Sequence, residues 1–598
     1  MKDLITDPTG IKPQVFLNFT CDTNADPYRT GSSNLLFEYK EYSPAPKIYN
    51  TQIYQLIILG NPIINDRIDH DGIFKMVQNG IEHVDWSVLN GEFLLVIENK
   101  LERNIKIIND RFASIPLFYS ASDFLIASVF YSDIWQKLKV QNKLKITSRN
   151  FFEFLWLNRI LGTKTYDEHS RYLLPASVLT YDAGTASISR YWEPSFEKTT
   201  ESIEECAVEM GRLLRQSVSR KTKDNGERIG LFLSGGMDSR TVLSSFNHPP
   251  VCFTLAVAYN NEVRVAKEVA DFVGAKHNFL KIDSDPYSDR LDEMVRIGNG
   301  MSSFENALFI GYRGKVSEEA DVLFHGHGID YMFQGMYVPR LPVTLFQRTL
   351  FFEKLRTISS DFVTDFLNNV PYRIKNIDLF AFVKRSHRKE LEESLRCSVQ
   401  EVVAAGKKYC NDPYDFWEYM LVHAMSRHYS NPNISSLATC GEQRTVTFDN
   451  DIFNFYLSLP VKYRLQGKIA RQNLMNMSSG LAKIKTGNTN LPATLSPAQK
   501  QAYWLRDWFL RKSLIRKQTR FHAPPEERTW PDRGMMYKLH DRLKYVALEM
   551  SRSEALDSLG FLDMDIVRNS VDSWVDKPSK FTGALISNLV TIDRFMKQ

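Results

Sequence analysis

The chain has 598 residues, which is too long for one domain on the usual size range and predicts at least two. Hydrophobic residues make up 43% of the chain and charged residues 24%, as in a globular protein with a large core. A net charge of +5 gives no indication of nucleic-acid binding. The six cysteines form no CxxC pair and no zinc spacing, which suits a reducing cytosol.

The N-terminal stretch MKDLITDPTGIKPQ contains no apolar signal core. Elsewhere, no run approaches the roughly 20 apolar residues of a membrane span. We therefore expect a cytoplasmic protein that binds neither membranes nor nucleic acid.

Short apolar runs separated by turns dominate from about residue 50 to residue 200. They predict strands at 53–60, 91–99, 104–110 and 123–128. Residues 177–192 predict a hairpin that turns between Asp182 and Thr185.

The periodicity becomes helical near Glu201, and Ser202 with Glu205 predicts a capping box at the start of a helix over 202–221. Strands and helices then alternate, which predicts a parallel sheet with helices on both faces. After about residue 340 the pattern is mainly helical, up to an apolar-periodic helix at the C-terminus. We expect the domain boundary at 193–201. The alternating elements are strands at 228–233, 251–257, 276–282 and 321–326, and helices from about Ser239 and over 262–273.

The stretch LFLSGGMDSR begins at Leu231 and ends the first of these alternating strands. The carboxyl ends of parallel strands are the usual ligand-binding edge of such a sheet. Gly235 and Gly236 carry no side chains, so phosphate oxygens can approach their N–H groups closely. The N-terminus of the following helix favours anions at the same place.

Three polar residues complete this loop. Ser234 and Ser239 can donate hydroxyl hydrogen bonds, whereas Asp238 would repel a bare phosphate, so its presence implies Mg²⁺ between carboxylate and phosphate. The loop is not a Walker loop, because it lacks the lysine, and it is not a GxSxG nucleophile elbow. We favour a nucleotide-binding loop over a plain connecting turn.

The SGGxDS pattern resembles the loop of the asparagine synthetase-like ligases, in the N-type ATP pyrophosphatase superfamily. The segment HGHGIDYMFQG resembles that family's G-E-G-x-D-E-x-F-x-G, with Gly326, Gly328 and Asp330 in register. The segment EQRTVTFD, from Glu442 to Asp449, resembles E-x-R-x-P-F-x-D. LNGEFLLVIEN, NDRFASIPLFY and FLIAS resemble the family's glutaminase-type N-terminal domain. The four motifs follow the family order over most of residues 55–490.

The resemblance implies an α+β glutaminase-like domain over 1–195, a sandwich of the Ntn type. An α/β parallel-sheet ATP-pyrophosphatase domain with a helical C-terminal part would follow over 196–598. In this family a carboxylate attacks the α-phosphate of ATP, and an amine then displaces AMP from the acyl-adenylate. Asp238 and Asp330 would hold Mg²⁺ on the pyrophosphate. The ATP-binding residues would be Leu231, Ser234, Gly235, Gly236, Asp238, Ser239, Val257, Gly326 and Gly328.

The sequence departs from the family at the glutaminase nucleophile, which is an N-terminal cysteine exposed after removal of Met1. Position 2 is Lys2, and the nearest cysteine is Cys21, for which a buried structural thiol is the commoner role. We therefore expect no glutamine hydrolysis. The N-terminal domain would keep a structural role or contact a substrate or partner.

A second departure places His327 where the family has the glutamate of G-E-G, as in the G-H-G-x-D pattern of lasso-peptide cyclases. A histidine with a pKa near neutrality could accept the proton of the incoming amine. His325 would share one face with His327, but no third ligand for a metal is evident. Glu442 is a further catalytic candidate from the third motif.

A third departure concerns the family's catalytic lysine, which lies in an R-x-K element that LAKIKTGNTNLP does not reproduce. Lys485 is the nearest candidate and Lys468 is another. An ordinary solvated lysine is an equally good interpretation of either.

Several functions stay open at this point. An ATP-dependent ligase without its own glutaminase would join a small-molecule or peptide carboxylate to ammonia or to a substrate amine. Alternatives are a lasso-peptide-type macrolactam cyclase, a glutamine-hydrolysing asparagine synthase and a non-catalytic nucleotide-binding protein. A homodimer or a partner protein is possible in each case.

Overall fold

A computed structural model gives the fold of most of the chain. Of the first two strands, β1 (Asn18–Cys21) and β2 (Leu35–Glu38), it describes only the backbone. Lys2 and the side chain of Cys21 therefore lie outside the described residues. The described ranges are 18–21, 35–38, 46–121, 125–182, 184–222, 226–282, 285–345, 348–512 and 533–598.

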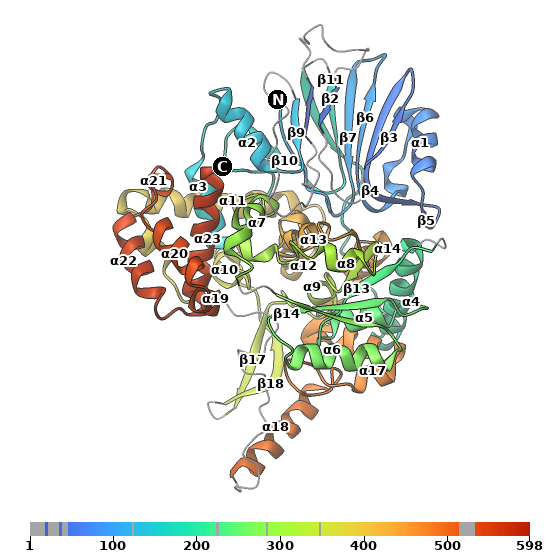
Figure 1. Cartoon of the computed structure of the whole chain (residues 1–598), viewed down its shortest axis with the longest axis vertical. Helices are drawn as coiled ribbons and strands as arrows, with labels where there is room; N and C mark the ends of the chain where they lie inside the picture. Colours follow the sequence, from blue (N-terminus) through green and yellow to red (C-terminus); the bar gives the residue numbers. More distant parts are fainter. Residues whose placement is uncertain are drawn as a thin grey trace.

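Two antiparallel sheets form the N-terminal part (Figure 1). One has the strand order β10-β8-β9-β1-β2 and the other β12-β11-β7-β6-β4-β3, with β5 paired to β4. The predicted strands and the 177–192 hairpin are confirmed among the described residues. The bounds are β3 Lys47–Asn50, β4 Tyr54–Ile64, β5 Arg67–Ile68, β6 Asn90–Asn99, β7 Asn104–Asn109, β8 Phe118–Ala121, β9 Leu125–Ser128, β10 Ser170–Tyr172, β11 Ser177–Asp182 and β12 Thr185–Arg190.

The alternation of side chains along β4 explains the layers. Leu56 and Ile58 point to one face, where they pack with Ile73 of helix α1 (His70–Gln78). Ile57 points to the other face and joins a cluster that includes Leu125 of the first sheet. The two sheets therefore share a hydrophobic layer, and α1 covers the outer face of the second sheet.

A five-stranded parallel sheet follows, with strand order β15-β14-β13-β16-β19. The predicted alternation of strands and helices is confirmed, and so is the capping box of Ser202 and Glu205. The sequence did not predict β19, because its residues Glu-Gln-Arg-Thr are polar. The bounds are β13 Ile229–Phe232, β14 Val251–Ala256, β15 His277–Lys281, β16 Val322–His325 and β19 Glu442–Thr445, with α4 Ile203–Lys221, α5 Asp238–Leu243 and α6 Asn261–Phe272.

The remainder is mainly helical, as predicted, and ends in the C-terminal helix α23 (Lys580–Lys597). The other helices are α2 Tyr131–Val140, α3 Ser148–Leu157, α7 Leu291–Ile297, α8 Arg313–Ser317, α9 Ile329–Phe333, α10 Phe362–Asn369, α11 Arg388–Gly406, α12 Pro413–Val422, α13 Ser430–Leu437, α14 Asn450–Ser458, α15 Val461–Arg464, α16 Lys468–Met477, α17 Ser479–Lys483, α18 Pro497–Lys512, α19 Arg533–Leu539, α20 Asp541–Met550, α21 Glu554–Asp557 and α22 Met564–Trp574.

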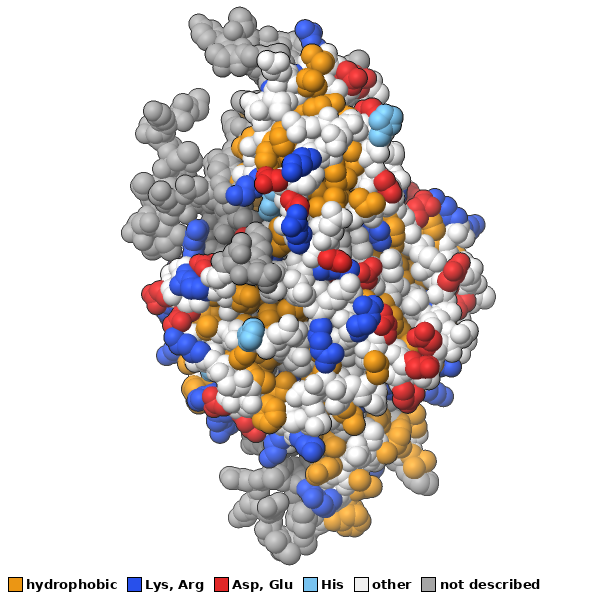
Figure 2. All heavy atoms as spheres, turned by 90° about the vertical axis from the view of Figure 1, so that its right-hand side faces the viewer, with side chains coloured by type: hydrophobic (Ala, Val, Ile, Leu, Met, Phe, Trp, Pro, Cys, Tyr) orange, Lys and Arg blue, Asp and Glu red, His pale blue; other side chains and the backbone are white. Residues whose placement is uncertain are grey.

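Besides β19, a hairpin of β17 (Arg340–Leu345) with β18 (Arg348–Leu355) departs from the helical prediction after residue 340. It extends from the lower end of the molecule beside α18 (Figure 1). Figure 2 shows hydrophobic side chains at the surface of this lower end. Leu345 of β17 is 55% exposed, and Phe509 of α18 is 63% exposed. No helix in the described ranges is long and apolar enough to cross a membrane.

Candidate functional site

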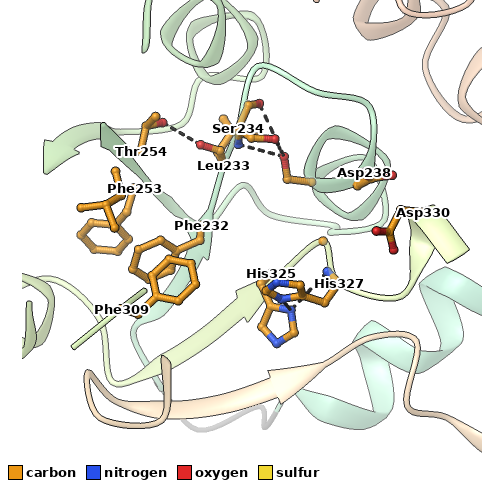
Figure 3. Close-up of a pocket in the computed structure, with 13 residues that line it drawn as sticks. Phe232, Leu233, Ser234, Asp238, Phe253, Thr254, Phe309, His325, His327 and Asp330 are labelled. Atoms are coloured by element: carbon orange, nitrogen blue, oxygen red, sulfur yellow. Dashed lines mark hydrogen bonds between the residues drawn. The ribbon is translucent and has the colours of Figure 1, made fainter. Parts of the chain in front are cut away.

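A cavity of about 200 Å³ opens at the carboxyl edge of the parallel sheet, where β13 and β16 end (Figure 3). Two loops supply its polar wall, one between β13 and α5 and the other between β16 and α9. Aromatic side chains form the opposite wall. The lining residues are Phe232, Leu233, Ser234, Asp238, Ser239, Phe253, Thr254, Leu255, Phe309, His325, Gly326, His327 and Asp330.

Hydrogen bonds within the first loop fix its shape. The Ser234 N–H donates to Ser239 Oγ at 2.9 Å, and the two hydroxyl oxygens are 3.0 Å apart. The Gly236 N–H donates to Ser234 Oγ at 3.2 Å, and the Gly235 N–H donates to Glu262 Oε1 at 2.7 Å. The Glu262 carboxylate thus occupies the Gly235 N–H. This N–H can contact a phosphate, as predicted, only when a phosphate oxygen replaces that carboxylate.

The segment 481–487 packs beside the loop 234–239 and is joined to it through Arg240. The buried Arg240 guanidinium donates to the carbonyl oxygens of Leu481 at 3.0 Å, Ile484 at 2.8 Å and Lys485 at 3.0 Å. The structure thus brings the Lys485 backbone beside the loop, whereas its side chain is exposed and absent from the cavity lining. Lys468, at the start of α16, is also exposed.

Two carboxylates, Asp238 and Asp330, line the same cavity. Burial and the neighbouring Asp330 raise the pKa of Asp238 well above its ordinary value. Burial also raises the pKa of Asp330, although the Tyr429 hydroxyl, which donates to Asp330 Oδ2 at 3.0 Å, lowers it. Gln334 donates to Asp238 Oδ1. The carboxylates of Asp238 and Asp330 repel each other, and carboxylate oxygens are the ligands that Mg²⁺ prefers, so this pair fits the predicted cation.

The second loop approaches the first closely, and this requires Gly326. A Cβ atom on Gly326 would lie 2.6 Å from the backbone nitrogen of Ser239. Gly328 has φ = 95°, and its Cβ would lie 2.0 Å from Thr447 Oγ1. Both glycines therefore position the loop, and of the two only Gly326 lines the cavity.

His325 and His327 lie on one face, as predicted, with their Nδ1 atoms 2.8 Å apart (Figure 3). Burial lowers the pKa of His325 to about 4, and burial with the neighbouring His325 lowers the pKa of His327 well below its ordinary value. The prediction of a near-neutral pKa for His327 is therefore wrong. The described residues contain no cluster of three or more His, Cys, Asp or Glu that could hold a metal ion.

Two predicted residues lie away from the cavity. Glu442 begins β19 beside Val322, at the amino end of the sheet, and forms an ion pair with Arg444 at 2.5 Å. Leu231 is fully buried and absent from the cavity lining, whereas the next two residues, Phe232 and Leu233, line the cavity. The structure therefore does not bring Glu442 or the Leu231 side chain to the site.

Val257 follows β14 and is partly buried against the cluster that includes Phe232, whereas Leu255 of the same strand lines the cavity. Sequence reasoning also missed Glu262 and Gln443. Gln443 Oε1 lies 3.1 Å from His325 Nε2, and Gln443 Nε2 donates to Glu92 Oε1 at 3.0 Å. These contacts join segments far apart in the chain, so local sequence patterns contain no signal for them.

A second, larger cavity of about 730 Å³ lies next to this site. Tyr429 connects the two cavities, since it lines the second and its hydroxyl donates to Asp330 of the first. Residues that follow α3 and α9, and residues of the C-terminal helices α19 and α23, contribute to its walls.

A parallel sheet with a glycine-rich loop and two carboxylates at its carboxyl edge is typical of nucleotide-binding proteins. The family model described as asparagine synthase matches residues 209–596, well over half of the chain. The chain belongs to the asparagine synthase family.

Several curated relatives match parts of the chain. An asparagine synthetase [glutamine-hydrolyzing] from Cricetulus griseus is 28% identical over 147 residues, 22% of this chain and 26% of the relative. Asparagine synthetase [glutamine-hydrolyzing] 3 from Bacillus subtilis (strain 168) is 22% identical over 271 residues, 41% of this chain and 44% of the relative. The matched segments thus span between a quarter and less than half of these relatives.

Solved structures give weaker likenesses. An NH3-dependent NAD synthetase from Campylobacter jejuni has a TM-score of 0.18 at 11% identity, over 38% of this chain and 95% of that one. A glutamine phosphoribosylpyrophosphate amidotransferase from B. subtilis has a TM-score of 0.17 at 8% identity, over 44% of this chain and 59% of that one.

Proposed function

We propose that this protein is an ATP-dependent carbon-nitrogen ligase of the cytoplasm that adenylates a substrate carboxylate and then forms an amide. The substrate carboxylate oxygen attacks the α-phosphorus of ATP, and pyrophosphate leaves. A neutral amine or ammonia then attacks the acyl carbon, AMP leaves, and the amine loses one proton. The observation that carries this proposal is the pair Asp238 and Asp330 beside the loop 234–239 in one cavity.

The roles of the residues follow from their positions. Ser234 and Ser239 present hydroxyl groups to the cavity, where they can donate to phosphate oxygens. Asp238 and Asp330 would hold Mg²⁺, which neutralises charge on the leaving pyrophosphate. Phe232, Phe253 and Phe309 form an apolar wall that suits the adenine ring. His327 lies beside the reacting groups and is neutral at pH 7, since its pKa is lowered.

The size of the second cavity bears on the substrate. A volume of about 730 Å³ lies within the range of about 300–1,000 Å³ typical of small-molecule sites. This favours a small-molecule carboxylate over a peptide precursor, and so favours a general amide ligase over a macrolactam cyclase.

Pyrophosphate exchange into ATP with a panel of carboxylic acids tests the adenylation step. We expect Asp238→Asn to lower the exchange rate by about 100-fold or more, because a cation ligand on the leaving group contributes several kcal/mol. Asp321→Asn is the control, since Asp321 is exposed at the amino end of β16. Exchange by the Asp238 variant at the wild-type rate would refute the assignment of the site.

The nitrogen source is tested separately. Because position 2 is Lys2, we propose that the protein does not hydrolyse glutamine. We expect no release of glutamate from glutamine, with or without ATP and acid, whereas ammonium or an amine should support product formation. Glutamate release in proportion to AMP formation would contradict this and would favour a glutamine-hydrolysing synthase.

A further inference from the structure

The second cavity receives a buried cation from the N-terminal part of the chain. Helix α3 ends at Asn158, whose left-handed conformation (φ 52°, ψ 23°) turns the chain out of the helix. The next residue, Arg159, is only 3% exposed and lines the cavity. Its guanidinium carbon lies 3.7 Å from the centre of the Tyr372 ring.

The buried charge of Arg159 has no carboxylate counter-ion among the described residues. Within the described part of the chain, no carboxylate forms an ion pair with Arg159, and its Nε atom has no hydrogen-bond partner. A buried guanidinium without a carboxylate is costly, because the protein interior solvates the charge poorly. The stacked tyrosine compensates part of this cost, since it presents the negative face of a π-system.

The other basic residues of the cavity leave a net positive charge. Arg533 pairs with Glu305 at 2.5 Å, and Arg340 pairs with Glu353 at 2.9 Å. Arg373 donates instead to the carbonyl oxygens of Leu367 and Asn368, both at 3.0 Å. Lys580 also lines the cavity, and its Nζ lies 4.8 Å from the centre of the Phe581 ring. Among the described residues, Arg159, Arg373 and Lys580 are thus the cations on this cavity with no carboxylate partner, and Arg159 is the buried one.

We propose that this cavity binds the substrate through a second anionic group, a carboxylate or a phosphate, which pairs with Arg159 and Arg373. The carboxylate to be adenylated would then lie at the Tyr429 side of the cavity, next to Asp330. This proposal rests on the proposed function and names its substrate class, an acid with at least two negative groups. It also gives the N-terminal part a role in substrate binding, because Arg159 precedes residue 195.

Matched acids test this substrate class in the full-length protein. Pyrophosphate exchange is compared for hexanoate and adipate, for 3-phenylpropanoate and phenylsuccinate, and for serine and O-phosphoserine. We expect kcat/KM to be higher for the dianionic member of a pair, and Arg159→Ala to reduce that preference by about 30-fold or more, as for loss of one partner of a buried charge pair. The O-phosphoserine pair distinguishes a phosphate from a second carboxylate.

Two variants separate charge recognition from a structural role. Arg149→Ala changes an exposed arginine on helix α3, which precedes Arg159, and should leave the preference unchanged. Arg159→Lys keeps the charge, so it should retain part of the preference for dianions, whereas Arg159→Gln should not. Should the Arg159 variants fail to fold, Arg373→Ala serves as the second test of the same anion.

Crystals of the full-length protein soaked in selenate give a readout without turnover. We expect anomalous density between Arg159 and Arg373. Equal exchange with mono- and dianionic acids, together with no selenate at this place, would overturn the inference and leave the proposed function standing. Exchange with none of the acids would count against the proposed function. Selenate density between Arg159 and Arg373 would then support the anion site, and its absence would overturn it.

Discussion

Asp238 and Asp330 form a buried pair of like charges that a bound cation would stabilise. Burial and mutual repulsion raise the pKa of Asp238 well above its ordinary value, so the bare pair is poorly stabilised as two anions. The glycine-rich loop after a predicted strand indicated Asp238, and the resemblance of HGHGIDYMFQG to the family motif indicated Asp330. The two carboxylates line one cavity because β13 and β16, which precede them, are neighbours in the sheet.

The pKa of His327 is lower than its predicted role as a proton acceptor requires. An imidazole near neutrality would have been a good base, but burial beside His325 makes His327 a weak base that stays neutral at pH 7. The sequence correctly placed the two histidines on one face, since they are two residues apart on an extended segment. It gave no means to predict how much water reaches them.

A pH profile tests the state of His327. We expect the ratio of the wild-type rate of amide formation to the His327→Ala rate to stay constant from pH 8 to pH 6. The reason is the sign of the shift, because a lowered pKa keeps the working, neutral form of His327 populated well below pH 6.5. Both rates are measured with saturating ATP and acid, so the titration of the shared groups cancels in the ratio.

Two other outcomes of the pH profile would contradict a neutral, participating His327. A ratio that falls with a midpoint near pH 6.5 as the pH is lowered would indicate an ordinary, solvated histidine. A ratio of one at every pH would show that His327 takes no part in amide formation.

At the scale of elements, the sequence predicted those whose signal is local. The strand at 91–99 is apolar and continuous, and the helix at 203–221 has both hydrophobic periodicity and a capping box. Strand β19 gave no such signal, because its polar residues make their contacts with distant ones, such as Arg444 with Glu227 at 2.9 Å. The β17–β18 hairpin was likewise missed, since its largely exposed strands lack an alternating apolar face.

The loop after β16 comes close to the start of α5, and Gly326 allows this approach. Its Cβ position lies 2.6 Å from the Ser239 nitrogen and 2.9 Å from the Asp238 carbonyl carbon, both backbone atoms. Gly326→Ala must therefore push the two loops apart. We expect a loss of about 1–3 kcal/mol in the free energy of unfolding, as for overpacking, and a marked fall in pyrophosphate exchange.

Gly314→Ala is the matched control, because nothing lies within 4 Å of its added Cβ and Gly314 is in helix α8. This change should leave exchange intact and stability equal or slightly higher. Wild-type stability and exchange in the Gly326 variant would mean that the two loops do not approach as closely as described.

At the scale of the whole molecule, the N-terminal sandwich and the C-terminal part share one hydrophobic core. Phe112 stacks on Phe448 with ring centroids 4.8 Å apart, and Tyr131 stacks on Phe595 at 5.4 Å. Both pairs belong to one continuous cluster of buried side chains. The boundary at 195 thus stays a prediction from the sequence, and the packing across it indicates that the two parts stabilise each other.

Polar contacts also cross between the two parts, at Glu92 of β6. Its Oε2 accepts from the Thr445 N–H at 2.7 Å and lies 3.5 Å from Lys221 Nζ, while its Oε1 accepts from Gln443. Because Gln443 in turn contacts His325, this buried carboxylate from the N-terminal sandwich supports the floor of the candidate site. No glutaminase activity is needed to explain why the chain has a glutamate there.

Replacement of Glu92 tests this connection. Glu92→Ala leaves the buried Lys221 charge without its carboxylate, so we expect the free energy of unfolding to fall by about 3 kcal/mol or more. Chemical denaturation measures the loss. Glu82→Ala is the control in the same part of the chain, because the Glu82 side chain is 59% exposed in its pair with Lys106 and should cost less than about 1 kcal/mol. Equal unfolding midpoints for the two variants would show that Glu92 does not join the sandwich to the site.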